Sequence, residues 1–245
     1  MNALAVKGLC KRYPAFSLEN VSFSVPEGAV MGFIGRNGAG KSTTLKALLG
    51  LVHPDAGEVT VLGKSFREEE QSIKERIGVV LGGIDFYPKK KVRLLSDVTR
   101  RFYGNWQEEK YRHYLNLFGI DQEKRVDQLS TGMRVKYMIA LALSHDARLL
   151  ILDEPTSGLD PVSRDELTEL LRRIAADGQR SVLFSTHITS DLEKCASHIT
   201  FIQEGRLQRS DTLAGFMAHY ADLGSTLEEI IVAAERRPYD ADAII

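Results

Sequence analysis

The sequence lacks the features that mark several classes of protein. Its two cysteines, Cys10 and Cys195, are too few for a disulfide scaffold and are not spaced as metal ligands. No stretch without Asp, Glu, Lys or Arg exceeds ten residues, whereas a membrane-spanning helix needs about 20 mostly apolar ones. The 32 Lys and Arg residues are balanced by 33 Asp and Glu residues, which argues against a protein that coats nucleic acid. We therefore expect a protein of a reducing compartment that reaches any membrane through a partner.

The sequence does contain the alternation of short strands and amphipathic helices that is typical of an α/β fold. Residues 3–27 alternate apolar and polar side chains, as the half-buried strands of an antiparallel sheet do. The uncharged apolar runs 149–152 and 181–184 are typical of central parallel strands covered on both faces, and a helix over 161–176 connects them. We predict one domain over residues 1–245, with an α-helical subdomain inserted at about 88–145 (helices 92–103, 107–118 and 131–144) and a short C-terminal extension over 205–245.

A glycine-rich loop follows the apolar run 29–34 and matches the pattern G-x-x-x-x-G-K-[ST], with a helix predicted over 42–51. Glycines let successive backbone N–H groups point at phosphate oxygens, and the N-terminus of the following helix adds a positive dipole end. Lys41 would neutralise the outer phosphates, and the Ser42 hydroxyl would ligate Mg²⁺. The flanking strand and helix disfavour the alternative of a glycine-rich surface turn. The predicted nucleotide-binding residues are Gly35, Arg36, Asn37, Gly38, Ala39, Gly40, Lys41, Ser42 and Thr43.

Two carboxylates, Asp153 and Glu154, directly follow the apolar run 149–152. A buried strand delivers Asp153 at its tip, where it can hold the metal through water. Glu154, one residue further, can act as general base on the attacking water. Without the phosphate-binding loop, two acids that merely end a strand in solvent would be the better interpretation. Together the two segments predict a nucleotide hydrolase of the phosphate-loop type.

Further residues resemble the ATP-binding cassette (ABC) family, the ATPase subunits of ABC transporters. Residues 129–133 (Leu-Ser-Thr-Gly-Met) are similar to the family's signature loop, usually Leu-Ser-Gly-Gly-Gln, and Ser130 lies 23 residues before Asp153, as the family requires. Residues 157–160 (Ser-Gly-Leu-Asp) resemble its D-loop, and 185–187 (Ser-Thr-His) resemble its switch histidine. The resemblance covers about five-sixths of the chain, and residues 152–200 are most similar to bacterial cassettes paired with export-type (ABC-2-like) permeases.

An aromatic residue before the phosphate-binding loop belongs to the same resemblance. Tyr13 stands where the family has a ring that stacks on adenine. Phe16 is three residues away, so the sequence leaves open that either ring simply belongs to the core.

The resemblance also implies a fold and a mechanism. The fold is a P-loop NTPase core with a mainly parallel central sheet, an N-terminal antiparallel β subdomain and the α-helical insertion. Two cassettes, identical or different, would pack head to tail, so that the signature of one closes over the ATP and Mg²⁺ held by the other. ATP then acts as a ligand of the closed dimer, and its hydrolysis reopens the dimer. The implied catalytic residues are Lys41, Glu154 and His187, the metal ligands Ser42 and Asp153, the signature residues Ser130, Thr131, Gly132 and Met133, and the D-loop residue Asp160.

The chain departs from the family's pattern at two places. Its signature has Thr131 and Met133 where glycine and glutamine are usual, but it keeps the serine and the second glycine, which would contact phosphate. We therefore expect ATPase activity that is retained, at an equal or lower rate. At the Q-loop the usual glutamine is missing, and residues 82–85 are Gly-Gly-Ile-Asp. The sequence leaves open whether Asp85 replaces that glutamine, and so puts the coupling of the nucleotide site to the helical subdomain in doubt.

We predict a cytoplasmic ATPase subunit, peripheral on the inner face of the cell membrane, that drives transport through separate transmembrane permease subunits. No nucleic-acid partner is expected. The alternative is a soluble or regulatory ABC ATPase whose ATP-dependent dimerisation signals rather than transports. A basic run, Lys89, Lys90, Lys91 and Arg93, is either a solvated face or a contact for acidic loops of a membrane subunit or anionic lipid headgroups.

Overall fold

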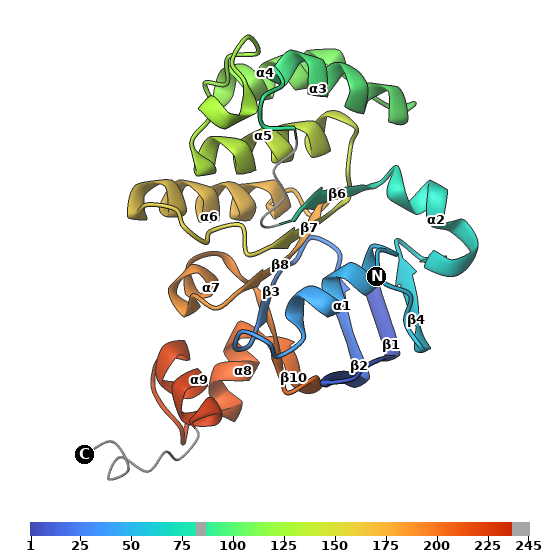
Figure 1. Cartoon of the computed structure of the whole chain (residues 1–245). Helices are drawn as coiled ribbons and strands as arrows, with labels where there is room; N and C mark the ends of the chain where they lie inside the picture. The colour runs from blue at the N-terminus through green and yellow to red at the C-terminus, as the bar shows by residue number, and fades with distance from the viewer. Residues whose placement is uncertain (82–86, 237–245) are drawn as a thin grey trace.

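The computed structural model describes residues 1–81 and 87–236, and a six-stranded sheet lies at its centre (Figure 1). The strand order is β10-β9-β3-β8-β7-β6. The five strands β6, β7, β8, β3 and β9 run parallel to one another. Strand β10 pairs antiparallel with β9 at the edge of the sheet. The predicted mainly parallel central sheet is therefore confirmed. Its strands are β3 (Val30–Ile34), β6 (Ile77–Val80), β7 (Leu149–Asp153), β8 (Ser181–Thr186), β9 (His198–Gln203) and β10 (Arg206–Thr212).

A second sheet of four antiparallel strands has the order β2-β1-β4-β5. Its inner face carries Val21, Phe23 and Val25, all buried, while Ser22 on the other face is exposed. The alternating pattern thus predicted the buried face of this sheet correctly, and the N-terminal antiparallel part of the fold class is confirmed. The strands are β1 (Asn2–Tyr13), β2 (Phe16–Pro26), β4 (Ala56–Val61) and β5 (Lys64–Ser65), and helix α2 (Phe66–Lys74) follows them.

Both faces of the six-stranded sheet are covered, as Figure 1 shows. On one face Leu149 and Ile151 of β7 belong to the core formed with α1 (Lys41–Leu48) and the second sheet. On the other face Leu150 and Leu152 pack among five helices. Because successive side chains of a strand point to opposite faces, a strand covered on both sides is apolar throughout. The five helices are α5 (Thr131–Ser144), α6 (Pro161–Ala175), α7 (Thr189–Cys195), α8 (Leu213–His219) and α9 (Leu227–Glu235).

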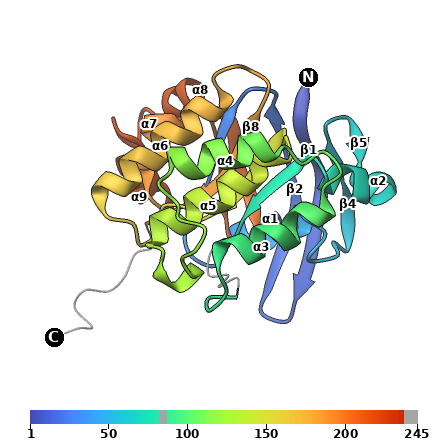
Figure 2. The ribbon, with the colours of Figure 1, turned by 90° about the horizontal axis from the view of Figure 1, so that it is seen from above.

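The helices between β6 and β7 have a small core of their own. It contains Val92, Tyr111, Val126 and Tyr137 and is shared with α5, whose opposite side contributes Ile139 to the core on the sheet. Figure 2, seen from above, shows α3, α4 and α5 lying over one another. The elements are α3 (Val92–Thr99), a 3₁₀ turn η1 (Arg100–Phe102), α4 (Glu108–Leu117) and a second 3₁₀ turn η2 (Val126–Gln128).

Three strands of the central sheet end at the same edge. Register pairs Ile34 of β3 with Thr186 of β8, and Asp153 of β7 with Ser185 of β8. The segments 35–40, 154–160 and 187–188, which follow these strands, therefore start from one edge of the sheet. Ligands of open α/β sheets bind at this carboxyl edge.

None of the helices within residues 1–81 and 87–236 combines the length and the apolar character needed to cross a membrane.

Candidate functional site

The phosphate-binding loop joins β3 to α1, and at two of its positions a side chain would collide with neighbouring strands. Gly40 has φ +113°, and a Cβ there would lie 2.6 Å from Leu18 Cδ2. A Cβ on Gly35 would lie 2.3 Å from the carbonyl oxygen of Ile202. The loop is thus pressed against β2 and β9, and its glycines are required by packing as well as by backbone conformation.

Lys41, the first residue of α1, turns its side chain back over this loop. Its ammonium donates to the carbonyl oxygens of Gly35 at 2.6 Å and Arg36 at 3.2 Å, and the residue is 5% exposed. The N-cap of α1 is Gly40, which has no side chain to accept from the first-turn N–H groups. A helix N-terminus of this kind, with a lysine fixed beside it, fits a phosphate group.

Asp153 and Glu154 are held at the end of β7 by one serine of the neighbouring strand. Ser185 Oγ donates to Asp153 Oδ1 at 2.5 Å and accepts from the N–H of Glu154 at 2.9 Å. Asp153 is 8% exposed, so this hydroxyl sets the orientation of a nearly buried carboxylate. Glu154 has φ +49°, an unfavourable conformation for a residue with a side chain, which indicates a functional constraint on its position.

The three residues predicted to be catalytic meet at the Glu154 carboxylate. Oε2 lies 2.8 Å from His187 Nδ1, and Oε1 lies 3.5 Å from Lys41 Nζ. Glu154 is partly exposed and His187 is 47% exposed, so the group opens to solvent on the histidine side. Three strand ends therefore assemble one cation, one carboxylate and one imidazole within hydrogen-bond or ion-pair distance.

Ser130 and Asp160 lie at the starts of two adjacent helices. Ser130 is the N-cap of α5, and its Oγ accepts from the N–H of Met133 at 3.2 Å. Asp160 is the N-cap of α6 and accepts from two N–H groups of its first turn, both at 3.0 Å. Hydrogen bonds from Ser163 and Val162 hold the pKa of Asp160 below its usual value.

The helices α5 and α6 run side by side from these two exposed caps. Gly132 lies against Ser163 near their starts, and one turn further Lys136 donates to Glu166 at 2.5 Å. Both caps therefore face solvent at the same end of the pair. The α5–α6 pair lies across the central sheet from α1, which carries Lys41 (Figure 1).

A comparison with protein families matches the family described as ABC transporter over residues 18–157, which is 140 of the 245 residues. The chain belongs to the ABC transporter family. A solved structure titled "Structure of ATP binding subunit of ABC transporter" superposes with a TM-score of 0.84 at 28% identity, covering 96% of this chain and 100% of that one. The resemblance and the fold class that the motifs predicted are thereby confirmed.

Two curated ABC relatives carry names that describe transport. The Bacitracin transport ATP-binding protein BcrA of Bacillus licheniformis is 35% identical over 193 residues, 78% of this chain and 63% of the relative. The Nod factor export ATP-binding protein I of Burkholderia orbicola (strain AU 1054) is 36% identical over 202 residues, 80% of this chain and 66% of the relative. The chain thus spans just under two thirds of the length of these relatives.

The structure separates the two aromatic candidates before the ABC phosphate-binding loop. Tyr13, at the end of β1, is 42% exposed, and Lys11 Nζ lies 5.8 Å from its ring centroid. Phe16 packs against the core, and a Cβ on Gly40 would lie 2.9 Å from its Cζ. Phe16 therefore packs against the phosphate-binding loop at Gly40 as part of the core. Tyr13 is the ring that remains accessible for stacking.

The remaining predicted residues of the cassette are placed as follows. Thr131 is exposed, whereas Met133 packs on the core of α3, α4 and α5. Ser42 and Thr43 are half-buried in the first turn of α1, and Asn37 and Gly38 are exposed in the loop. Asp85 and its neighbours in the Q-loop lie outside the described residues.

Two residues of the site carry no signal of their own in the sequence. Ser185 belongs to the segment that resembles the switch histidine, and the parallel register of β7 and β8 places it beside Asp153. Glu235, the last residue of α9, contacts Arg36 of the phosphate-binding loop across 199 positions of sequence. No local pattern predicts a contact of that separation.

Proposed function

We propose that the chain is the ATP-hydrolysing subunit of an ABC exporter, bound at the cytoplasmic face of the cell membrane to permease subunits. The observation that carries this proposal is the convergence of Lys41, Glu154 and His187 at the carboxyl edge of the central sheet. The names of both relatives describe transport, and the one that describes Nod factor export supports the direction. ATP binding would close a pair of cassettes, and hydrolysis would reopen it.

The chain's own residues perform three tasks in this hydrolysis. Lys41 and the N–H groups at the start of α1 bind the phosphates. Glu154 takes the proton of the attacking water, and His187 orients that carboxylate through the 2.8 Å contact. When Lys41 turns to a phosphate, the 3.5 Å ion pair with Glu154 is released, so that Oε1 becomes available as a base.

Ser42 and Asp153 are the residues that would hold Mg²⁺. They supply a hydroxyl and a carboxylate oxygen, the hard donors that this ion prefers, and Ser185 fixes the Asp153 carboxylate at 2.5 Å. Within the described residues no group of three or more His, Cys, Asp or Glu side chains forms a metal cage, which fits an ion held mainly by phosphate oxygens. When bound, the ion neutralises charge on the transferring phosphate.

The paired N-termini of α5 and α6 are the surface that would cover the partner's nucleotide. Ser130 and Asp160 are exposed at the same end of these helices, and α1 with Lys41 lies across the sheet. A positive helix end with an exposed hydroxyl suits a phosphate group. We therefore propose a head-to-tail pair of cassettes, in which each chain supplies one half of each nucleotide site.

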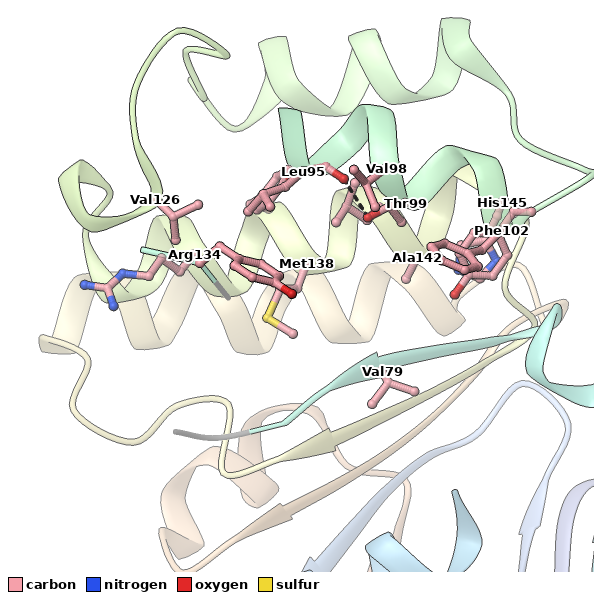
Figure 3. A pocket seen from close by; sticks show the side chains of 14 residues that line it. Val79, Leu95, Val98, Thr99, Phe102, Val126, Arg134, Met138, Ala142 and His145 are labelled. Atoms are coloured by element: carbon pink, nitrogen blue, oxygen red, sulfur yellow. Dashed lines mark hydrogen bonds between the residues drawn. The ribbon is translucent and has the colours of Figure 1, made fainter. Parts of the chain in front are cut away.

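An apolar cavity of about 480 Å³ lies between the insertion and the central sheet, and we propose that it receives a segment of the permease. Figure 3 shows Val98, Phe102 and Met138, from α3, η1 and α5, above Val79 on β6. Val98 and Phe102 are 46% and 75% exposed and both line the cavity, and exposed apolar side chains that cluster in this way are typical of a surface that meets a partner.

The basic run beside this cavity is partly neutralised within the chain. Lys91 Nζ and Arg93 Nη1 lie 2.7 and 3.5 Å from the Glu123 carboxylate, and Lys89 and Lys90 are exposed. The two exposed lysines would pair with acidic residues that flank the apolar segment of the permease.

Glu154→Gln tests the proposed hydrolysis. Glutamine keeps a hydrogen bond to His187 but cannot take a proton from water, so ATP turnover should fall by about 10²–10⁴-fold. ATP binding should persist, and sedimentation with ATP and Mg²⁺ should show an accumulated dimer. The control is Glu70→Gln, which changes a surface carboxylate paired with Lys74 and should leave phosphate release unchanged. A Glu154→Gln chain that hydrolyses ATP within a few-fold of the wild-type rate would contradict the proposal.

Val98→Asp and Phe102→Asp test the permease contact. A carboxylate forced into an apolar interface costs several kcal/mol, so the fraction of the chain that sediments with native membranes should fall about tenfold or more. ATP turnover of the isolated chain should stay unchanged. Leu117→Asp is the matched control, because Leu117 is 61% exposed on α4 and does not line the cavity. Equal membrane association of all three variants would contradict the contact, and a wild-type chain absent from membranes would favour the regulatory alternative.

A further inference from the structure

The C-terminal helix α9 ends with a carboxylate placed against the phosphate-binding loop. The backbone N–H of Arg36 donates to Glu235 Oε1 at 3.1 Å, and Arg36 Nε lies 3.6 Å from Oε2. Glu235 is 7% exposed, whereas the Arg36 side chain is 62% exposed. The surrounding protein therefore shields the Glu235 carboxylate from water. The carboxylate points at the loop that precedes Lys41.

Packing of α9 fixes this position independently of the ion pair. Leu227 and Ile230 are fully buried in the core on the sheet, and Gln203 of β9 donates to the carbonyl oxygen of Ala234 at 3.3 Å. At the other end of the helix, Thr226 and Glu229 form a capping box. The sheet and α9 thus hold Glu235 at the loop even if the contact with Arg36 is lost.

The charge at this position opposes the charge that the loop would bind. Burial raises the pKa of Glu235, and the hydrogen bond from Arg36 together with the positive charges of Arg36 and Lys41 lowers it again in part. The field of this carboxylate therefore reaches Lys41, the same cation that is placed for phosphate. In a partly dehydrated loop a fixed negative charge repels a phosphate chain more strongly than it would in water.

We propose that Glu235 is an affinity-setting residue of the nucleotide site, which weakens nucleotide binding through its charge at the phosphate-binding loop. This inference rests on the proposed function, since it assumes that the loop binds nucleotide. The penalty grows with the charge of the ligand, so it is larger for MgATP than for MgADP. Glu235 acts through Arg36 and Lys41 and is a positioning residue rather than a catalytic one.

Glu235→Gln is the test, because glutamine keeps an oxygen that can accept from the Arg36 N–H and removes only the charge. The dissociation constant for MgATP, measured by calorimetry in 50 mM salt, should fall by about 3–10-fold, and that for MgADP by less. A purely structural role of Glu235 would not produce this dependence on ligand charge.

Two further variants control for folding and for charge elsewhere on α9. Glu228→Gln removes an exposed charge from the same helix and should leave both dissociation constants unchanged. Glu235→Asp keeps the charge and should bind MgATP close to the wild-type level. If Glu235→Gln unfolds at a lower temperature than wild type, Glu235→Ser serves as a second neutral variant with the same expected gain.

The outcomes separate this inference from the proposed function. A Glu235→Gln chain whose affinity for MgATP is unchanged or weaker, while wild type binds MgATP, overturns the inference alone. A gain that is equal for MgATP and MgADP also overturns it. A wild-type chain that retains no nucleotide contradicts the proposed function itself.

Discussion

The chain presents two helix N-termini suited to phosphate, and they differ in how completely the chain surrounds them. At α1 the cation Lys41 is 5% exposed and is held by two carbonyl oxygens and the Glu154 carboxylate. At α5 the N-cap Ser130 is exposed, and its hydroxyl accepts from the N–H of Met133 within its own first turn. The first helix end is built into the protein, and the second lies on its surface.

This difference fits the proposed division of each nucleotide site between two copies of the chain. The end at α1 is complete within one chain, because β7 and β8 supply Glu154 and His187 beside it. The end at α5 has a second exposed helix end next to it, that of α6, but α1 lies across the sheet from both. The end of α6 is already capped by the Asp160 carboxylate, so Ser130 at the start of α5 is the group on this surface that suits a phosphate brought to it.

Ser130→Ala should distinguish the helix end at α5 from that at α1 most strongly, because it should affect ATP turnover but not the binding of ATP to the monomer. In the proposed closed pair the Ser130 hydroxyl would contact the γ-phosphate, so its loss should lower ATP turnover by about 10²–10³-fold. The affinity of the monomer for ATP should stay unchanged, because the chain's own loop is intact. Turnover at saturating ATP, together with nucleotide affinity of dilute monomer, checks both expectations.

The substitution also removes a helix cap, which by itself costs about 0.5–2 kcal/mol of stability. Thr212→Ala removes the corresponding cap of α8, where Thr212 Oγ1 accepts from the N–H of Gly215 at 3.0 Å, and should leave turnover unchanged. Ser130→Thr keeps the hydroxyl and should retain most activity. A loss of ATP affinity by the Ser130→Ala monomer would contradict the division of the site between two chains.

The end at α1 could be predicted from sequence because each of its parts is local. The loop pattern and the apolar strand before Asp153 depend on neighbours within a few residues, and the structure places them as expected. The contact of Glu235 with Arg36 could not be predicted in this way, because it depends on how α9 packs on the sheet.

The insertion shows a different limit of pattern analysis. The helical spacing of Leu94, Leu95, Val98 and Phe102 would place them on one apolar stripe, yet Leu94 and Val98 are 47% and 46% exposed, and Leu95, Val98 and Phe102 line the cavity. The buried face of α3 instead contains Ser96, whose hydroxyl bonds to those of Tyr111 and Tyr137 at 2.6 and 2.8 Å. A buried serine satisfied by two tyrosines does not follow hydrophobic periodicity, and an apolar stripe at an interface cannot be told from one in a core.

Tyr13→Ala should produce the smallest of the expected effects. It tests whether the nucleotide site at the start of α1 includes a ring that stacks on adenine. If the exposed ring stacks on adenine, its loss should weaken ATP binding by about 1–3 kcal/mol. Tyr13→Phe keeps the aromatic face and should bind ATP as wild type does. Tripolyphosphate has no base, so its inhibition constant against ATP should not change in Tyr13→Ala.

Phe16→Leu provides the matched comparison for that result. Leucine retains apolar volume against Gly40 and Leu18, so a ring that only supports the loop should be replaced with little loss of affinity for ATP or tripolyphosphate. A loss of ATP affinity with unchanged tripolyphosphate binding in Phe16→Leu, and none in Tyr13→Ala, would assign the stacking ring to Phe16. The exposed position of Tyr13 and the packing of Phe16 behind Gly40 favour the opposite result, because a stacking platform has to present its face to the ligand.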